Sequence, residues 1–297
     1  MTTLYEQIRA NKVRSFILVI GVLVVVIGVV GLYSYVVRGD FALPVLAAII
    51  AIPSSLIGYF AGDKIALASN GAHALPREAA PDLHNVVENL AITAGVPKPK
   101  LYLIDSPALN AFATGRDPQH ASIAVTRGLV ERLERTELEG VLAHELSHVK
   151  NYDIRFSTFI AIFVGFIVIL SDLFLRGAMW GGIARRDDRN NSQASGLLAI
   201  IGFVLLLLSP LIIKLIQLAV SRQREYLADA AGALLTRYPE GLASALEKIG
   251  NASTMPTAGK ATAHLYIANP FKGRSFVHLF ATHPPIAQRI KRLRSVA

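Results

Sequence analysis

The stretch His144-Glu145-Leu146-Ser147-His148 carries the pattern H-E-x-x-H, and the rest of the chain is interpreted from it. Residues four apart lie one turn apart on the same face of an α-helix, so the two imidazoles can bind one zinc ion. Glu145 lies beside them, where it can take a proton from a water molecule on the metal. The pattern also arises by chance, and the alternative is a surface helix with two histidines and a glutamate.

The residues around the motif favour a partly buried helix. Val141-Leu142-Ala143 and Leu146 are apolar. A buried glutamate between two buried histidines is costly without a metal or polar partners. Thr136 and Glu139 have the spacing of a capping box, which predicts that the motif helix starts there.

The composition indicates a membrane protein. Hydrophobic residues make up 53% of the 297 residues, and charged residues make up only 17%. The formal net charge is +9, but the basic residues flank apolar segments or are spread along the chain. Anionic lipid headgroups explain this pattern better than nucleic acid, so we expect a bilayer and no nucleic acid as partner. The chain has no cysteine, so any zinc site must use histidines and carboxylates.

Two apolar runs near the start predict a transmembrane hairpin over residues 15–61. Ser15–Val37 is free of charge and long enough to cross a ~30 Å hydrocarbon core, and Phe41–Ala61 follows after a short turn. The first run is too long for the apolar part of a signal peptide. Residues 1–14 form a tail that we expect in the cytoplasm, because basic residues favour that side. These residues are Arg9, Lys12 and Arg14.

Residues 62–297 are expected to form the catalytic domain, interrupted by hydrophobic segments 156–175 and 196–220. Those two segments either cross the membrane or lodge at it. Hydrophobic periodicity predicts an α+β fold that is mostly α, with a small β-sheet. The predicted helices are 81–94, one from near 127 into the motif, 238–249 and 284–293, and the predicted strands are 100–104, 110–114 and 121–125.

One predicted strand is a candidate for holding substrate. An endopeptidase that cleaves unfolded chains must bind their backbone, and strand addition to an exposed sheet edge does this. Ala121–Val125 is short and β-branched, so it is the candidate edge, with Asn110–Thr114 flanking the same groove. The alternative is that both are internal strands.

The third metal ligand is sought after the fourth apolar run. Glu225 and Asp229 are four apart and share a helical face. One can bind the metal while the other accepts a hydrogen bond from a ligand histidine. If the last two apolar runs form an antiparallel hairpin, this helix emerges beside the motif helix. The alternative is a pair of ordinary surface charges.

With these motifs in place, the chain resembles the HtpX-like integral-membrane metallopeptidases, which are relatives of the CAAX prenyl proteases. The resemblance covers nearly the whole chain, including the N-terminal hairpin. Its motifs are Asn110-Ala111-Phe112-Ala113-Thr114-Gly115, His144 to His148 continuing to Asn151 and Asp153, Arg224-Glu225-Tyr226 with Asp229, and Thr282-His283-Pro284-Pro285 with Arg289.

The resemblance implies a gluzincin-type metallopeptidase domain with one zinc ion. It implies His144, His148 and Glu225 as zinc ligands, Glu145 as the general base and Asp229 as the partner of a ligand histidine. It also suggests that His283 lies near the site, where it could stabilise the developing oxyanion, although a packing role is the alternative. Arg222, one turn before Glu225, is a second candidate for that role.

The sequence therefore predicts a zinc-dependent endopeptidase of the cell membrane with a cytoplasmic catalytic domain. The resemblance implies polypeptide substrates, notably damaged or misfolded membrane proteins. Two rivals are a selective processing protease and a catalytically silent metal-binding scaffold. Glu145 argues against the scaffold, because a structural metal site needs no base. A transporter or channel fits poorly with so large a polar domain.

Overall fold

The computed structural model describes residues 42–162, 222–252, 255, 258–259, 261–270 and 284–295, and scattered positions between 9 and 28. Its named elements are α2 (Ala42–Ser69), β1 (Ala72–Ala74), η1 (Arg77–Ala79), α3 (Pro81–Ala94), β2 (Lys100–Ile104), β3 (Ala111–Gly115), η2 (Pro118–His120), β4 (Ala121–Thr126), α4 (Arg127–Arg132), α5 (Arg135–Lys150), α8 (Arg222–Thr236), α9 (Pro239–Asn251), η3 (Ala263–Leu265) and α10 (Ile286–Arg294). The predicted mostly α, α+β architecture is confirmed.

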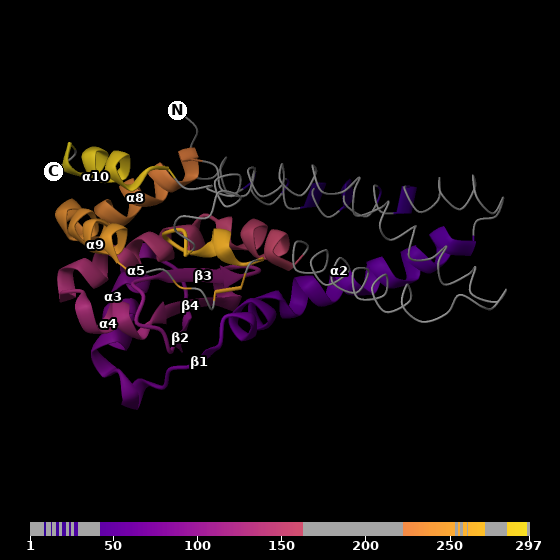
Figure 1. Cartoon of the computed structure of the whole chain (residues 1–297), viewed down its shortest axis with the longest axis horizontal. Helices are drawn as coiled ribbons and strands as arrows, with labels where there is room; N and C mark the ends of the chain where they lie inside the picture. Colours follow the sequence, from indigo (N-terminus) through magenta and orange to yellow (C-terminus); the bar gives the residue numbers. More distant parts are fainter. Residues whose placement is uncertain are drawn as a thin grey trace, which may run out of the picture.

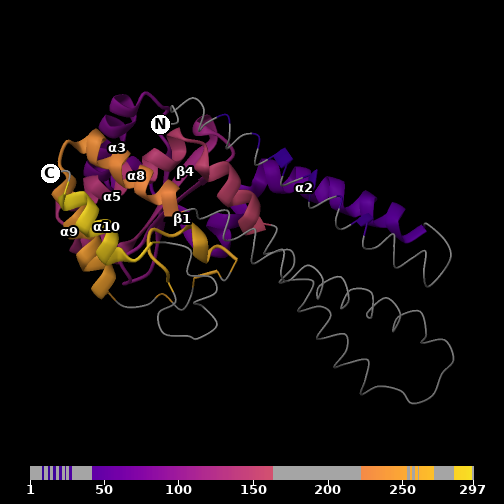
Figure 2. The same cartoon turned by 90° about the horizontal axis from the view of Figure 1, so that it is seen from above.

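The four strands form one mixed sheet in the order β1-β2-β4-β3. β2 and β4 run parallel, whereas β1 pairs with β2 and β3 pairs with β4 antiparallel. Helix α5 lies beside the sheet. Helices α8 and α9 pack on the side of α5 that faces away from the sheet, and α10 packs on α9 and α8, while α2 projects away from these elements (Figure 1). The turned view shows the same projection of α2 (Figure 2).

This strand order corrects the prediction about the sheet edge. β4 has a hydrogen-bonded partner on both sides, so residues 121–125 are internal and their ladder bonds are already used. The edge of the sheet on this side is β3. The sequence did not reveal this because β2 and β4 pair in parallel across a connection that contains all of β3, a long-range choice that local patterns do not encode.

The start of α5 also differs from the prediction. The helix begins at Arg135, so Thr136 lies inside its first turn rather than at its cap. Instead, the Glu137 carboxylate accepts a hydrogen bond of 2.8 Å from the backbone N–H of Glu134. Lys248 of α9 holds the same carboxylate at 2.7 Å, so a tertiary contact selects this cap.

The predicted membrane segments fall largely outside the described residues. Most of the first apolar run, residues 163–175 and all of 196–220 lie there, and the second run is covered by α2. Among the helices that the structure does describe, none has both the length and the apolar character required to cross a bilayer. The hairpin and the domain boundaries therefore stay predictions.

Candidate metal centre

Helix α5 carries the motif through the centre of the catalytic body, by which we mean the sheet together with α3, α4, α5, α8, α9 and α10. His144 and Glu145 are 1% and 2% exposed, which excludes the alternative of a surface helix. Two glycines let neighbouring helices approach it closely. A Cβ on Gly140 would lie 2.6 Å from the backbone nitrogen of Leu242 in α9, and one on Gly232 of α8 would lie 3.0 Å from that of His144. The backbones of α8 and α9 therefore pack directly against the motif helix.

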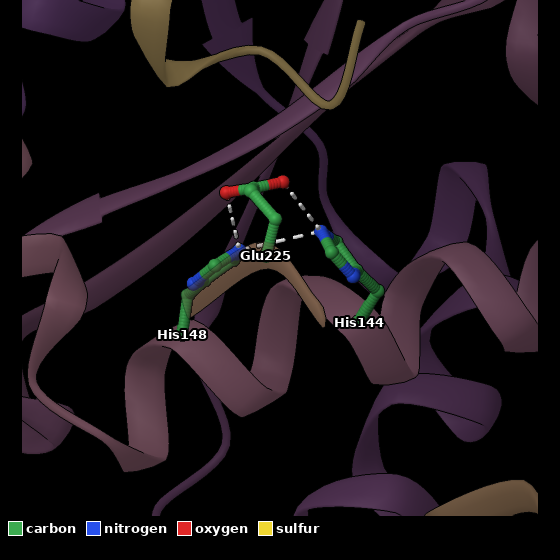
Figure 3. A group of neighbouring side chains, drawn as sticks. All are labelled: His144, His148 and Glu225. Carbon is green, nitrogen blue, oxygen red and sulfur yellow. Dashed lines mark hydrogen bonds and ion pairs between the residues drawn. The ribbon is translucent and has the colours of Figure 1, made fainter. Parts of the chain in front are cut away.

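Three side chains converge between α5 and α8. The Nε2 atoms of His144 and His148 lie 3.2 Å apart, and Glu225 points at both of them (Figure 3). Its carboxylate oxygens lie 3.8 Å from His144 Nε2 and 3.6 Å from His148 Nε2. These three residues could hold a metal ion, because their ligand atoms all lie within 4.8 Å of one another.

The geometry of the two imidazoles fits zinc. Two nitrogens each bound about 2.0–2.1 Å from a tetrahedral zinc ion are about 3.3 Å apart. The observed Nε2–Nε2 distance is 3.2 Å. The donor set of two histidines and one glutamate is also a common one for catalytic zinc, which keeps a fourth position open.

Each imidazole is fixed from behind by a carboxylate. His144 Nδ1 lies 3.0 Å from Asp229 Oδ1, and His148 Nδ1 lies 3.1 Å from Asp153 Oδ2. A hydrogen bond at Nδ1 leaves Nε2 as the nitrogen that can bind a metal. Asp153 comes five residues after His148, and the sequence offered it only as part of a family motif.

A buried arginine completes the network. Arg289 of α10 is 0% exposed and donates two hydrogen bonds to Asp229, of 2.9 and 2.6 Å. It also donates to the backbone carbonyl of Ile267 at 3.1 Å and lies 3.7 Å from Glu225. The sequence offered Arg289 only as part of a family motif, and no spacing rule connects it to residues sixty positions earlier.

The charges of the pocket also fit a divalent cation. Among the residues that the structure describes, four buried carboxylates lie at or next to the metal site, and two arginines face them. When all four are ionised, a divalent cation balances the remaining negative charge. The carboxylates are Glu145, Asp153, Glu225 and Asp229, and the arginines are Arg224 and Arg289.

Burial and these neighbours shift the pKa values of the site. Burial raises the pKa of Glu145 to about 7, which suits a group that must accept and return a proton near neutral pH. Burial lowers the pKa of His144 to about 4. Burial alone would lower the pKa of His148, but its bond to Asp153 and the charge of Glu225 outweigh this and raise it to about 9. Burial opposes ionisation of Asp229, yet Arg289 holds its pKa at about 2.

The convergent side chains line one pocket. Its walls come from α5, α8, β3, the helix that begins at Asp153 and the segment before α10. The lining residues are Ala113, His144, Glu145, His148, Asp153, Ile154, Ser157, Arg224, Glu225, His264, Leu265, Tyr266 and Ile267.

The two candidates for oxyanion stabilisation are placed differently. Arg222 is exposed at the first residue of α8, whereas Arg224 lines the pocket 3.6 Å from Asp153. His283 lies outside the described residues. His264, to which the sequence assigned no role, is buried in the pocket wall, where its Nε2 lies 3.1 Å from the carbonyl of Ser157.

The comparisons agree with this geometry. Residues 77–297 match the model of peptidase family M48. The chain is 48% identical over 298 residues to a "Protease HtpX homolog" of Caldanaerobacter subterraneus subsp. tengcongensis, covering 99% of this chain and 98% of the relative. It is 45% identical over 295 residues to a "Protease HtpX homolog" of Tropheryma whipplei, covering 99% and 98%.

Among solved structures, the crystal structure of S. mikatae Ste24p is similar with a TM-score of 0.48 and 18% identity, over 98% of this chain and 66% of that one. The family assignment does not depend on that likeness. It follows from the family match over 77–297 and from the near full-length identity to the HtpX homologues. The chain belongs to peptidase family M48 and is a metallopeptidase.

Proposed function

We propose that the protein is a zinc-dependent endopeptidase held at the cell membrane, with His144, His148 and Glu225 as its metal ligands. One observation carries the proposal: the two Nε2 atoms, 3.2 Å apart, converge with the Glu225 carboxylate in a pocket that Glu145 also lines. A structural metal site has no need of a base in the same pocket. This arrangement therefore favours hydrolysis over a silent scaffold.

The chemistry divides between the metal and the chain. When bound, zinc polarises the scissile carbonyl and lowers the pKa of a water molecule. Glu145 takes a proton from the attacking water and then gives it to the leaving amine nitrogen. Asp229 and Asp153 hold the two imidazoles by Nδ1 and keep Nε2 directed at the site. The oxyanion-stabilising group is proposed to be His283, with Arg222 as the second candidate from the sequence.

The substrates we propose are unfolded or misassembled membrane proteins, as the resemblance to HtpX-like enzymes implies. The corrected sheet order makes β3 the strand that substrate backbone would join. Ala113 of β3 lines the pocket beside Glu145, so a chain added there would lie next to the metal ligands. Selective processing of a few substrates remains the second candidate, because the same groove serves both.

The test measures metal content and peptide cleavage on the same preparations. The full chain in detergent should hold one zinc ion and cleave an unfolded model protein, and a chelator should abolish cleavage. Glu145→Gln should keep the zinc and lose cleavage, because an amide cannot accept the proton. His148→Ala should lose both. A Glu145→Gln enzyme with undiminished turnover would falsify the assignment of the base.

A further inference from the structure

A short segment before α10 forms one wall of the pocket, and we call residues Thr262–Ala268 the strap. Four of its residues, His264, Leu265, Tyr266 and Ile267, line the pocket that holds the metal-binding side chains. The strap lies along the edge of β3 that does not pair with β4, where the N–H of Ile267 donates to the carbonyl of Ala111 at 2.9 Å. Its position therefore decides the width of the groove beside β3.

The strap is tied to the end of α2 through one buried side chain. Asn70 directly follows α2 and is 5% exposed. Its Nδ2 donates to the carbonyl of Ala66 at 2.7 Å and to Oγ1 of Thr262 at 2.8 Å. Its Oδ1 accepts from the N–H of Gly259 at 2.9 Å and from the hydroxyl of Tyr266 at 3.0 Å. These bonds join α2 to both ends of the turn that enters the strap.

Only an amide of this size can make these four bonds. Asparagine has two N–H donors and an oxygen with two acceptor positions, and here all four are used. An aspartate would lose both donors and bring a buried charge, and an alanine would lose every bond. A buried group left without its partner costs more than the bond itself contributes.

Tyr266 transmits the position of Asn70 to the pocket. Its side chain is 0% exposed, and its ring packs edge-on against Phe112 of β3 with centroids 5.0 Å apart. One end of Tyr266 is therefore fixed by Asn70 and its body by the strand beside the metal ligands. The ring belongs to a buried cluster with Ala66, Leu67 and Phe112, so Tyr266 connects the end of α2 to the strap, and the same residue lines the pocket.

The strap also limits how substrate backbone can meet β3. The carbonyl of Ala111 is taken by Ile267, and the N–H of Gly115 donates to Oγ1 of Thr158 at 3.2 Å. Ala113 lies between them and faces the pocket. The N–H of Ala113 donates a hydrogen bond to the Glu145 carboxylate, so with the strap in place substrate backbone would meet β3 at the carbonyl of Ala113. A displaced strap would open Ala111 as well and change the groove.

We propose that Asn70 is a positioning residue for the peptidase reaction. It holds the strap in place and so keeps the groove beside β3 at the width that substrate requires. The inference rests on the endopeptidase site proposed above. Asn70 does not touch the reacting atoms; it acts through Thr262 and Tyr266. It also makes α2 a part of the substrate groove, because the final turn of α2 supplies the carbonyl of Ala66 to the same network.

The experiment compares Asn70→Ala, Asn70→Asp and Tyr266→Phe with Asn89→Ala, the same kind of truncation at an exposed site on α3. Each full-length, zinc-loaded protein is assayed in detergent for zinc content, kcat and KM with a fluorogenic peptide. Chymotrypsin cleavage after residues 265 and 266 reports separately whether the strap opens.

For both Asn70 variants we expect zinc content within about twofold of the parent and KM raised about tenfold, with kcat changed far less. Asn70→Asp loses the two donated bonds and Asn70→Ala loses all four, and these bonds hold the strap rather than the metal ligands. Strap cleavage by chymotrypsin should become faster. Tyr266→Phe, which removes one hydroxyl, should show a smaller change in the same direction, and it carries the test if the Asn70 variants fail to fold. Asn89→Ala should match the parent.

Two results would overturn the proposal. One is an unchanged KM and unchanged strap cleavage in folded Asn70→Ala. The other is a parallel loss of zinc, stability and kcat with KM constant, which would make Asn70 a structural residue only. Failure of the proposed function looks different, because the parent would then bind zinc without cleaving peptide, while chymotrypsin would still report the strap.

Discussion

At the scale of single residues, the site depends on groups that never touch the metal. Asp229 is the clearest case, because it holds His144 Nδ1 at 3.0 Å and is itself held by Arg289. We predict that Asp229→Asn weakens zinc affinity roughly 10- to 100-fold, the usual effect of losing such a partner. Zinc titration against a competing chelator measures this. Asp63→Asn, in α2, is the control, and equal affinities in the two variants would contradict the role.

Arg289 gives a second prediction at this scale. Replacing it with methionine keeps much of the volume but leaves Asp229 as a buried charge without its two hydrogen bonds. Breaking a buried ion pair by removing one partner costs about 3–5 kcal/mol. We expect Arg289→Met to lose stability on that scale in chemical denaturation. Arg294→Met removes an exposed arginine of the same helix that pairs with Glu240, and it should cost far less.

At the scale of elements, the close contacts of α5 with α8 and α9 hold the ligands in register. Gly140→Ala would place a methyl group 2.6 Å from the backbone of Leu242, so the two helices must move apart. Overpacking of this kind costs about 1–3 kcal/mol. We predict a lower Tm and weaker zinc binding. Gly250→Ala is the matched control, because among the described residues its methyl would meet Ile286 at an ordinary 3.5 Å, and it should leave both quantities unchanged or raise Tm.

The elements also show what a sequence can and cannot predict. The strand 100–104 and the helix 81–94 coincide with β2 and α3, because local periodicity and the Pro81 and Gly95 boundaries define them. Helical spacing predicted that His144 and His148 share a face, and the family resemblance singled out Glu225 as the third ligand. The internal position of β4, the Glu137 cap and the bonds of Arg289 could not be predicted, because each depends on a partner that is distant in the chain. The bond of Asp153 depends on the turn at Tyr152, which has a positive φ that the sequence pattern does not reveal.

At the scale of the whole molecule, metal binding should couple to folding. The ligands come from α5 and α8, which are far apart in the chain, so a bound ion stabilises the assembled body and not the unfolded chain. At a free zinc concentration 1,000 times Kd the gain is about 4 kcal/mol. We predict that a chelator lowers Tm in the parent protein and leaves Tm of His148→Ala unchanged. An equal fall in both would mean that the chelator acts elsewhere.

The orientation of the chain is the remaining whole-molecule prediction. The basic residues Arg9, Lys12 and Arg14 precede the first apolar run, and this favours a cytoplasmic N-terminus. Two crossings would then return the catalytic body to the cytoplasm. The arginines of the loop after the third run argue the other way if segments 156–175 and 196–220 both cross fully, since that loop would then lie outside. These arginines are Arg176, Arg185, Arg186 and Arg189.

The absence of cysteine makes this testable with single introduced thiols. A cysteine in place of Ile92, which is 73% exposed on α3, should react with a membrane-impermeant maleimide only after the membrane is opened. A cysteine at position 190 reports the side of the loop between segments 156–175 and 196–220. If it is protected in intact cells, as position 92 should be, the two segments lodge at the membrane. If it is labelled in intact cells, they cross the membrane. Labelling of position 92 in intact cells would place the catalytic body outside and overturn the cytoplasmic assignment, because a catalytic body reached from outside cannot follow an even number of crossings from a cytoplasmic N-terminus.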